Sequence, residues 1–591
     1  MLAGEGHSRR GPRPGRTGPD RAAYVVEAVA AARPAPTEGS PTEGSPAEGS
    51  PVGGPARNGA GPSRITSGGP VPRQLPHAIA DFVGREDVLA VVGDALVGDR
   101  ATGVAVLVGR PGVGKSSTAV RAAHLLAGQN YPDGQLYCDM RGTGGEPVDS
   151  ADALGRFLRS LGMAGQEVPD DTDERASVYR GLLANRRVLV VLDDAASETQ
   201  VVPLLPGHRR CGVIVTSRSR FTALPGVVPA EMDPLTADQA VRLLCRVLGE
   251  ERVAREEGAA RTLVRMVGRL PLALRVAAAR LAARSHWPIA AMVERLADER
   301  SRLDELTHGD LTVRASLSLT YESLGEAESR AFALLGMVAG RTIPSWTVGA
   351  VFDDRRTWPS DLAEPLVDAY VLDVVGRDPA GEPVYRFPDL ARAYAREKLY
   401  QAQDESARSR ALERVAGGWS ALVEAANRRN GGGGHDRPGA VHAPWSPPDL
   451  LVERLVADPA VWFEQERANL FQTVEHTARE GLHRQCWRLV TGLSEFLVRS
   501  GGVEDLRGVY ESALPLTEAA PRAGAAPRSP GSVQGPGREI PRSVHERALS
   551  VFTERGEEQG RALVLRHLSH LGTREGEGAV TGFRRDAHLS P

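Results

Sequence analysis

The stretch Val104-Ala-Val-Leu-Val-Gly-Arg-Pro-Gly-Val-Gly-Lys-Ser116 decides the fold of this 591-residue chain. Its first five residues are apolar, which is typical of a parallel strand that is buried on both faces of a sheet. The glycines at 109, 112 and 114 let the backbone turn tightly enough to aim several N–H groups at one anion. The pattern G-x-x-x-x-G-K-S after an apolar strand therefore predicts a phosphate-binding loop.

Lys115 stands out because the chain has only two lysines, at 115 and 398, among its 72 basic residues. Its compact charge on a flexible stem suits the β- and γ-phosphates of a nucleotide, and the Ser116 hydroxyl suits Mg²⁺. The helix that is expected to start near Lys115 would direct the positive end of its dipole at the same phosphates. We expect ADP or ATP, with Mg²⁺, to contact these loop residues: Gly109, Gly112, Val113, Gly114, Lys115, Ser116 and Ser117.

Three further strands are expected after the loop, at residues 135–139, 187–194 and 212–217, and helical segments separate them. Strands that alternate with helices indicate a parallel sheet covered on both faces, with ligand bound at the carboxyl ends of the strands. The fold class is therefore α/β for this part of the chain, and the sheet is expected to position the chemistry.

Two acids, Asp193 and Asp194, end the apolar run that begins at Val188. A carboxylate at this point can hold Mg²⁺ through water, and a second can orient an attacking water. Asp193 is the metal candidate beside Ser116, and Asp194 is the candidate base. The alternative is that the two acids cap the helix that follows.

Arg218 follows the next strand, in the run Thr216-Ser217-Arg218. An arginine at a strand end can reach the terminal phosphate of a nucleotide and act in catalysis. The alternative is an ordinary surface arginine, which is common in a chain so rich in this residue.

Composition divides the chain into eight segments. The Gly/Pro-rich residues 1–75 are expected to be a disordered tail, because they carry too little apolar surface to offset the entropy of ordering. The spacing of apolar residues after 233 predicts helices, with one short hairpin near 371–387. The predicted domains are a nucleotide-binding domain at 76–232, a helical domain at 233–307, a winged helix at 308–402, a repeat-like helical region at 403–518 with a loop at 425–448, a linker at 519–541, a helix pair at 542–575 and a tail at 576–591.

The charge and the cysteines restrict the class of protein. A net charge of −3 supplies no overall electrostatic attraction for nucleic acid. The four cysteines lie far apart and include no C-x-x-C pair, which argues against a zinc site and favours a reducing compartment. No apolar run approaches the roughly 20 residues that would span a bilayer. We expect a cytoplasmic protein that does not use a membrane.

A series of motifs in this order resembles the NB-ARC class of STAND signalling ATPases. It comprises Asp81-Phe-Val-Gly-Arg-Glu86, the phosphate loop, the strands ending at Asp194 and Arg218, Gly268-Arg-Leu-Pro-Leu-Ala273 and Tyr385-Arg-Phe-Pro-Asp389. The likeness spans residues 74–515 and is greatest to bacterial antibiotic-regulatory proteins, through Gln74-Leu-Pro, Gln135-Leu-Tyr and the run from Asp389 to Glu397.

The resemblance implies further site residues. Phe82, Val83 and Arg85 would line the adenine and ribose side of the nucleotide, and Pro271 and Leu272 would close over the base. In the family, an aromatic-His-Asp motif touches the β-phosphate of ADP and locks the resting state. This chain has Pro388 where that histidine stands, and proline offers neither a side-chain donor nor a backbone N–H.

Three functions remain open from the sequence: a nucleotide-controlled switch, a remodelling ATPase and a nucleotide-stabilised scaffold. The resemblance implies tetratricopeptide-like repeats at the C-terminal end that meet a ligand or protein, and self-assembly that depends on the nucleotide. Direct DNA binding is not expected, because the relatives read DNA through a winged helix placed before the ATPase, whereas a disordered tail is predicted here.

Overall fold

A computed structural model describes residues 70–97, 101–143, 146–224, 226–299, 301–309, 311–355, 359–431, 445–500 and 502–513, and a few residues between 546 and 565. Residues 1–69 of the predicted tail lie outside the described residues, as do the linker at 519–541, the final tail and most of the predicted helix pair. The predicted bound of the tail at 75 is wrong, because Arg73 forms a parallel bridge with Gln135 and the Gln74 N–H donates to the Gln135 carbonyl. The chain forms two compact units: residues 1–108 with 115–232, and residues 109–114 with 233–591.

The first unit contains a five-stranded sheet in the order β2-β3-β4-β1-β5. Strands β1, β2, β3 and β4 are parallel, as the sequence predicted, and β4 lies between β1 and β3. Their bounds are β1 Val104–Gly109, β2 Gln135–Asp139, β3 Leu189–Ala195, β4 Gly212–Ser217 and β5 Val228–Met232. The carboxyl ends of β1 and β3 therefore both adjoin the end of β4.

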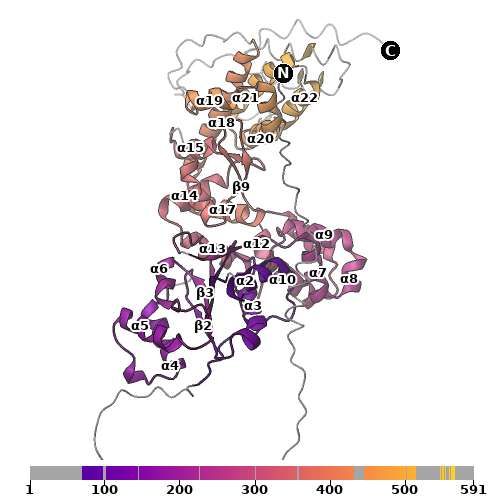
Figure 1. The fold of residues 1–591 in the computed structure, drawn as a ribbon. Coiled ribbons are helices and arrows are strands. Elements are labelled where there is room, and N and C mark those ends of the chain that lie inside the picture. Colours follow the sequence, from indigo (N-terminus) through magenta and orange to yellow (C-terminus); the bar gives the residue numbers. More distant parts are fainter. Residues whose placement is uncertain are drawn as a thin grey trace, which may run out of the picture. The chain divides into compact units, whose positions relative to one another are not determined.

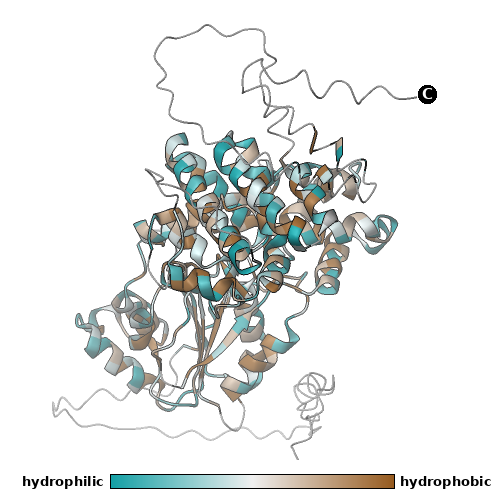
Figure 2. Cartoon of the chain, turned by 90° about the horizontal axis from the view of Figure 1, so that it is seen from above, coloured by the Kyte–Doolittle hydropathy of each residue, from teal (hydrophilic) through white to brown (hydrophobic). Residues whose placement is uncertain are grey.

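Helices cover this sheet (Figure 1). Helix α3 packs against β3, β4 and helix α2, and α4 packs against α5. Coloured by hydropathy, the strands are mostly hydrophobic, whereas the helices carry both kinds of residue (Figure 2). The helices of this unit are α2 Glu86–Val97, α3 Lys115–Asn130, α4 Ser150–Ser160, α5 Thr172–Leu183 and α6 Glu198–Val201.

The second unit is mainly helical. Its first part, residues 237–312, ends in a short antiparallel pair of strands. Its elements are α7 Ala237–Leu248, α8 Glu250–Arg255, α9 Glu257–Met266, α10 Pro271–Ala283, α11 Ile289–Ala297, α12 Arg302–Glu305, β6 Thr307–His308 and β7 Leu311–Thr312. A capping box at Thr236 and Gln239 begins α7, which explains why this helix starts where the sequence predicted it.

The next part combines helices with a three-stranded sheet in the order β8-β10-β9. The hairpin expected near 371–387 is confirmed as β9 and β10, which pair in antiparallel. The elements are α13 Val313–Glu322, α14 Glu326–Leu335, β8 Ile343–Pro344, α15 Trp346–Phe352, α16 Glu364–Asp368, β9 Asp373–Arg377, β10 Pro383–Arg386 and α17 Asp389–Ala402.

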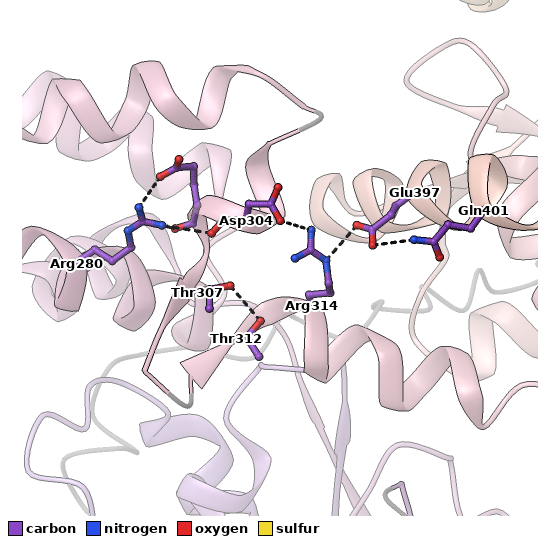
Figure 3. Close-up of polar contacts among 8 residues, drawn as sticks. Arg280, Asp304, Thr307, Thr312, Arg314, Glu397 and Gln401 are labelled. Atoms are coloured by element: carbon purple, nitrogen blue, oxygen red, sulfur yellow. Dashed lines mark hydrogen bonds and ion pairs between the residues drawn. The ribbon is translucent and has the colours of Figure 1, made fainter.

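Arginines join these helices through carboxylates (Figure 3). Arg280 of α10 pairs with Glu305 at 2.8 Å, and both side chains are largely buried. Arg314 of α13 donates to Asp304 of α12 at 2.7 Å and to Glu397 of α17 at 3.2 Å. One guanidinium thus holds three helices together.

Long helices form the last described part, where α18, α20 and α21 pack against one another (Figure 1). Their bounds are α18 Glu405–Arg429, α19 Asp449–Leu455, α20 Pro459–Arg479, α21 His483–Ser500 and α22 Val503–Ser512. The predicted loop at 425–448 begins too early, because α18 continues to Arg429, whereas its end is confirmed, because α19 begins at Asp449. Trp445, near this end, is buried. Trp445 stacks on Trp346 with ring centroids 6.1 Å apart, so packing fixes this end.

Glu466 is a buried acid inside α20 and gives this region a pH dependence. Burial, and then the charge of Asp378, raise the pKa of Glu466 to about 7, against the lowering effect of its hydrogen bond from Asn469. The folded protein thus favours the protonated acid, whereas the unfolded chain ionises near 4.5. Stability contributed by this group is present at low pH and is lost as the pH rises from about 4.5 to 7.

We expect Glu466→Gln to remove this loss, because the amide keeps an oxygen for Asn469 and carries no charge. At pH 8 the variant should be more stable than wild type by on the order of 2 kcal/mol, and at pH 4 equally stable. Urea unfolding at both pH values measures this, with the exposed Glu464→Gln as control. A Glu466→Gln variant that is no more stable than wild type at pH 8 contradicts the expectation.

Candidate functional site

The predicted phosphate loop connects β1 to α3, as expected. Gly109, Gly112 and Gly114 have φ values of 147°, 75° and 97°, which L-residues with a side chain rarely adopt. Helix α3 begins at Lys115, with Ser116 and Ser117 in its first turn, and Val113 is fully buried. The local backbone therefore has the form that the glycine spacing predicted.

Lys115 lies among two acids and an arginine in the first unit. Burial of the ammonium group, and then the charge of Arg218, lower the pKa of Lys115 to about 7, whereas Asp194 and Asp193 oppose this effect. Burial also lowers the pKa of Arg218, and Asp194 opposes it. Four of the predicted site residues are therefore close enough to influence one another's charge.

Two hydroxyl groups hold the carboxylate of Asp193, which is only 8% exposed. Tyr137 of β2 donates to Oδ2 at 3.0 Å, and Thr216 of β4 donates to Oδ1 at 2.5 Å. Each carboxylate oxygen keeps a lone pair for another donor, such as a water bound to a metal ion. Asp193 is thus oriented by both neighbouring strands.

Asp194 adopts a positive φ of 54°, which is unusual for a residue with a side chain. Its backbone N–H donates to Thr216 Oγ1 at 2.8 Å, and its Oδ2 accepts from the N–H and the hydroxyl of Thr143 at 3.1 and 2.6 Å. These bonds hold the strained turn. The alternative that the two acids cap α6 is wrong, because Ser197 supplies the cap of that helix.

Sequence reasoning assigned no role to Tyr137, Thr143 or Thr216, although these residues orient the two acids. Tyr137 and Thr216 lie in strands that were predicted, so their place on a sheet was foreseeable, whereas their pairing with Asp193 depends on strand order. Thr143 follows β2 in an irregular segment, and no local pattern in the sequence marks it.

The residues expected around the base fall in two places. Arg85 is buried with φ 72°, directly before α2 and after Phe82 and Val83 in the first unit. Pro271 and Leu272 begin α10 in the second unit, where the loop residues 109–114 also belong.

Leu272 contacts the loop directly. Its N–H donates to the carbonyl of Gly112 at 3.2 Å, and a Cβ at Gly112 would lie 3.2 Å from the Leu272 side chain. Pro271 lies near Gly114, at 3.9 Å from the position of a Cβ there. The structure thus brings two residues of the Gly-Arg-Leu-Pro-Leu motif onto the phosphate loop.

Pro388 stands at the start of α17 and supplies no side-chain cap. It lines an apolar cavity together with Pro111, Gly112, Leu272 and Leu390. An apolar lining suits a proline here and offers little to a charged ligand group.

Among the described residues, no group of three or more His, Cys, Asp or Glu side chains is arranged to hold a metal ion. Ser116 and Asp193 would be the residues to hold Mg²⁺, an ion that proteins usually bind through one or two ligands together with substrate phosphates. Nor does any described helix have both the length and the apolar character to cross a membrane.

Comparison with known proteins finds one family model and two curated proteins that are similar to this part of the chain. Residues 85–254 match the model of the NB-ARC domain. The regulatory protein AfsR of Streptomyces coelicolor is 44% identical over 332 residues, which cover 55% of this chain and 33% of AfsR. AfsR of Streptomyces griseus is 42% identical over 327 residues, with the same coverage. The matched region spans about a third of the length of these curated relatives.

Among solved structures, the chain is similar to a STAND protein with a tetratricopeptide repeat sensor from Pyrococcus horikoshii. The two share 15% identity and a TM-score of 0.28, over 85% of this chain and 75% of that one.

Proposed function

We propose that this chain is a regulatory switch of the STAND class that is controlled by bound ADP or ATP; the match of residues 85–254 to the NB-ARC model supports the proposal. The observation that carries the proposal is the clustering of Lys115, at the start of α3, with Asp193, Asp194 and Arg218, at the ends of β3 and β4. A cation for phosphates, a carboxylate for a metal ion and a second acid are the groups that phosphoryl chemistry requires.

Each residue has a distinct part in this proposal. Lys115 binds the β- and γ-phosphates, and the loop glycines present their N–H groups to the same oxygens. Ser116 and Asp193 hold Mg²⁺, which neutralises charge on the phosphates. Asp194 orients water, and Arg218 reports whether the terminal phosphate is present. Phe82, Val83 and Arg85, all in the first unit, line the base and ribose.

The second unit supplies the regulated part. We assign residues 308–402 to a winged helix, since β8, β9 and β10 accompany five α-helices among the residues that the structure describes there. The helices from 403 onward form tetratricopeptide-like pairs that bind a protein or small ligand. Nucleotide can bias the arrangement of such domains only if ADP and ATP bind two arrangements unequally.

The decisive experiment identifies the nucleotide and its effect on assembly. Nucleotide released by denaturing the purified protein is identified by chromatography, and the mass of the protein is measured by light scattering with ADP and with ATP. A switch predicts retained ADP and a difference in mass or in partner binding between the two nucleotides. Equal affinities and identical behaviour with both contradict the switch.

We expect Asp193→Asn to weaken binding of Mg²⁺–ATP by about 10-fold or more, which is the usual loss when a group that orients a bound metal is removed. Binding of ADP without metal should change little, because Lys115 is untouched. Titration calorimetry with and without Mg²⁺ measures both quantities.

Asp139→Asn is the matched control, since Asp139 pairs with Asp193 in the register of β2 and β3 but is exposed. Unchanged dependence on Mg²⁺ in Asp193→Asn would remove this residue from the metal site.

The second candidate is a nucleotide-stabilised scaffold with little hydrolysis, and the apolar surroundings of Pro388 favour it. A scaffold binds nucleotide tightly and shows negligible turnover. A turnover number well above about 1 per second would instead indicate a remodelling ATPase.

A further inference from the structure

An ion pair joins the phosphate loop to the hairpin of the second unit. Nη2 of Arg110 lies 2.6 Å from Oδ1 of Asp373, the first residue of β9. The side chains are 21% and 15% exposed, so most of each charge is removed from water. Exposed ion pairs contribute little to stability, but a pair this enclosed is costly to leave half-made.

The backbone around Asp373 fixes the position of its carboxylate. Tyr370 has a left-handed φ of 57°, which turns the chain sharply after α16. Val371 and Leu372 are then buried and anchor the start of β9. Arg386, opposite Asp373 in the hairpin register, places its Nη2 3.8 Å from the other carboxylate oxygen.

The backbone beside Arg110 is also fixed by its neighbours. It lies two residues before Gly112, which packs against Leu272 and whose carbonyl accepts a hydrogen bond from the Leu272 N–H. Arg110 itself lines the apolar cavity that also includes Pro388 and Val371. An apolar wall on one side lowers the local dielectric and strengthens the attraction between the two charges.

We propose that the Arg110–Asp373 pair is a latch that fixes the phosphate loop to the hairpin and slows the release of nucleotide. This inference rests on the proposed nucleotide binding. Pro388 has no polar side-chain group with which to hold the loop. The Arg110–Asp373 ion pair instead connects the loop to β9, which precedes α17 in the chain. The loop cannot separate from β9 without breaking the pair.

The test measures how fast a fluorescent ADP analogue leaves the full-length protein after excess ATP is added. We expect Asp373→Asn and Arg110→Gln each to release it about 5-fold faster or more, a typical lower bound for coupling between two sites. The double variant should release it no faster than either single variant, because both remove the same interaction. Raised salt should accelerate release in wild type more than in Asp373→Asn.

Asp368→Asn is the matched control, since Asp368 is an exposed acid at the end of α16. The charge reversal Arg110→Asp with Asp373→Arg should restore slow release in part. Release from Asp373→Asn at the wild-type rate overturns the latch.

Hydrogen exchange of the loop amides separates this proposal from the proposed function, because it needs no nucleotide. With the latch, Asp373→Asn raises exchange across residues 109–114 in nucleotide-free protein. If exchange rises in the variant but the protein binds no nucleotide, the result supports the contact and contradicts the proposed function. Unchanged exchange together with wild-type release ends the latch alone.

Discussion

Replacement of Lys115 by alanine is expected to weaken the binding of ADP and ATP by at least about 100-fold. Removal of one partner from a buried, charged contact typically costs 2–5 kcal/mol, and about 2.7 kcal/mol corresponds to a factor of 100 in Kd. In this site the loss is compounded, because Arg218 remains as the main cation while Asp193 and Asp194 remain as anions close to the phosphates. Titration calorimetry with either nucleotide measures the loss.

The chain supplies its own control for this prediction, because Lys398 is its other lysine. The ammonium of Lys398 lies 5.2 and 5.3 Å from the rings of Tyr321 and Tyr394, within the second unit. Lys398→Ala should therefore leave nucleotide affinity unchanged within about 2-fold, since the change removes a cation–π contact and no phosphate ligand. Lys115→Ala with wild-type affinity would mean that nucleotide binds elsewhere.

Replacement of Gly142 by alanine is expected to destabilise the first unit by about 3 kcal/mol, the upper part of the usual range for overpacking. An added Cβ would lie 2.5 Å from the carbonyl oxygen of Asp194 and 2.7 Å from the carbonyl carbon of Ala195. These are backbone atoms at the end of β3 and cannot rotate away as a side chain can. The same displacement would move Asp194, so under the proposed function nucleotide hydrolysis should fall together with stability.

Gly128→Ala gives the opposite expectation and serves as its control. Gly128 lies inside α3, and nothing lies within 4 Å of a Cβ added there. The alanine should stabilise the protein by up to about 1 kcal/mol, because alanine is the better helix former. Urea unfolding compares the two variants, and equal effects of both would refute the steric argument for Gly142.

How far the sequence predicts this structure depends on the kind of strand. Strands β1, β3 and β4 are buried, and buried parallel strands appear in a sequence as continuous apolar runs. Strand β5 was not foreseen, because Val228-Pro-Ala-Glu-Met232 contains a proline and a charge, and its burial alternates. It stands at the edge of the sheet, where a missing N–H is tolerated and no continuous apolar run is needed.

The site shows the same division between local and distant information. Gly112, Gly114 and Lys115 were predictable, since their chemistry depends on spacing within one loop. The partners of Asp193 and Asp373 were not, because Thr216 and Arg110 reach them across 23 and 263 positions in the chain. The spacing of residues in one segment contains no information about such contacts.

The contacts of Arg314 show why arginine and lysine should be counted separately when the composition of this chain is compared with that of other proteins. A single guanidinium serves Asp304 and Glu397 at once, in two directions set by its planar fork. A lysine ammonium also has several donors, but all of them sit on one atom, so it could bridge the two carboxylates only if both lay close to that atom. The guanidinium therefore lets α12 and α17 be joined through α13 while their carboxylates stay apart.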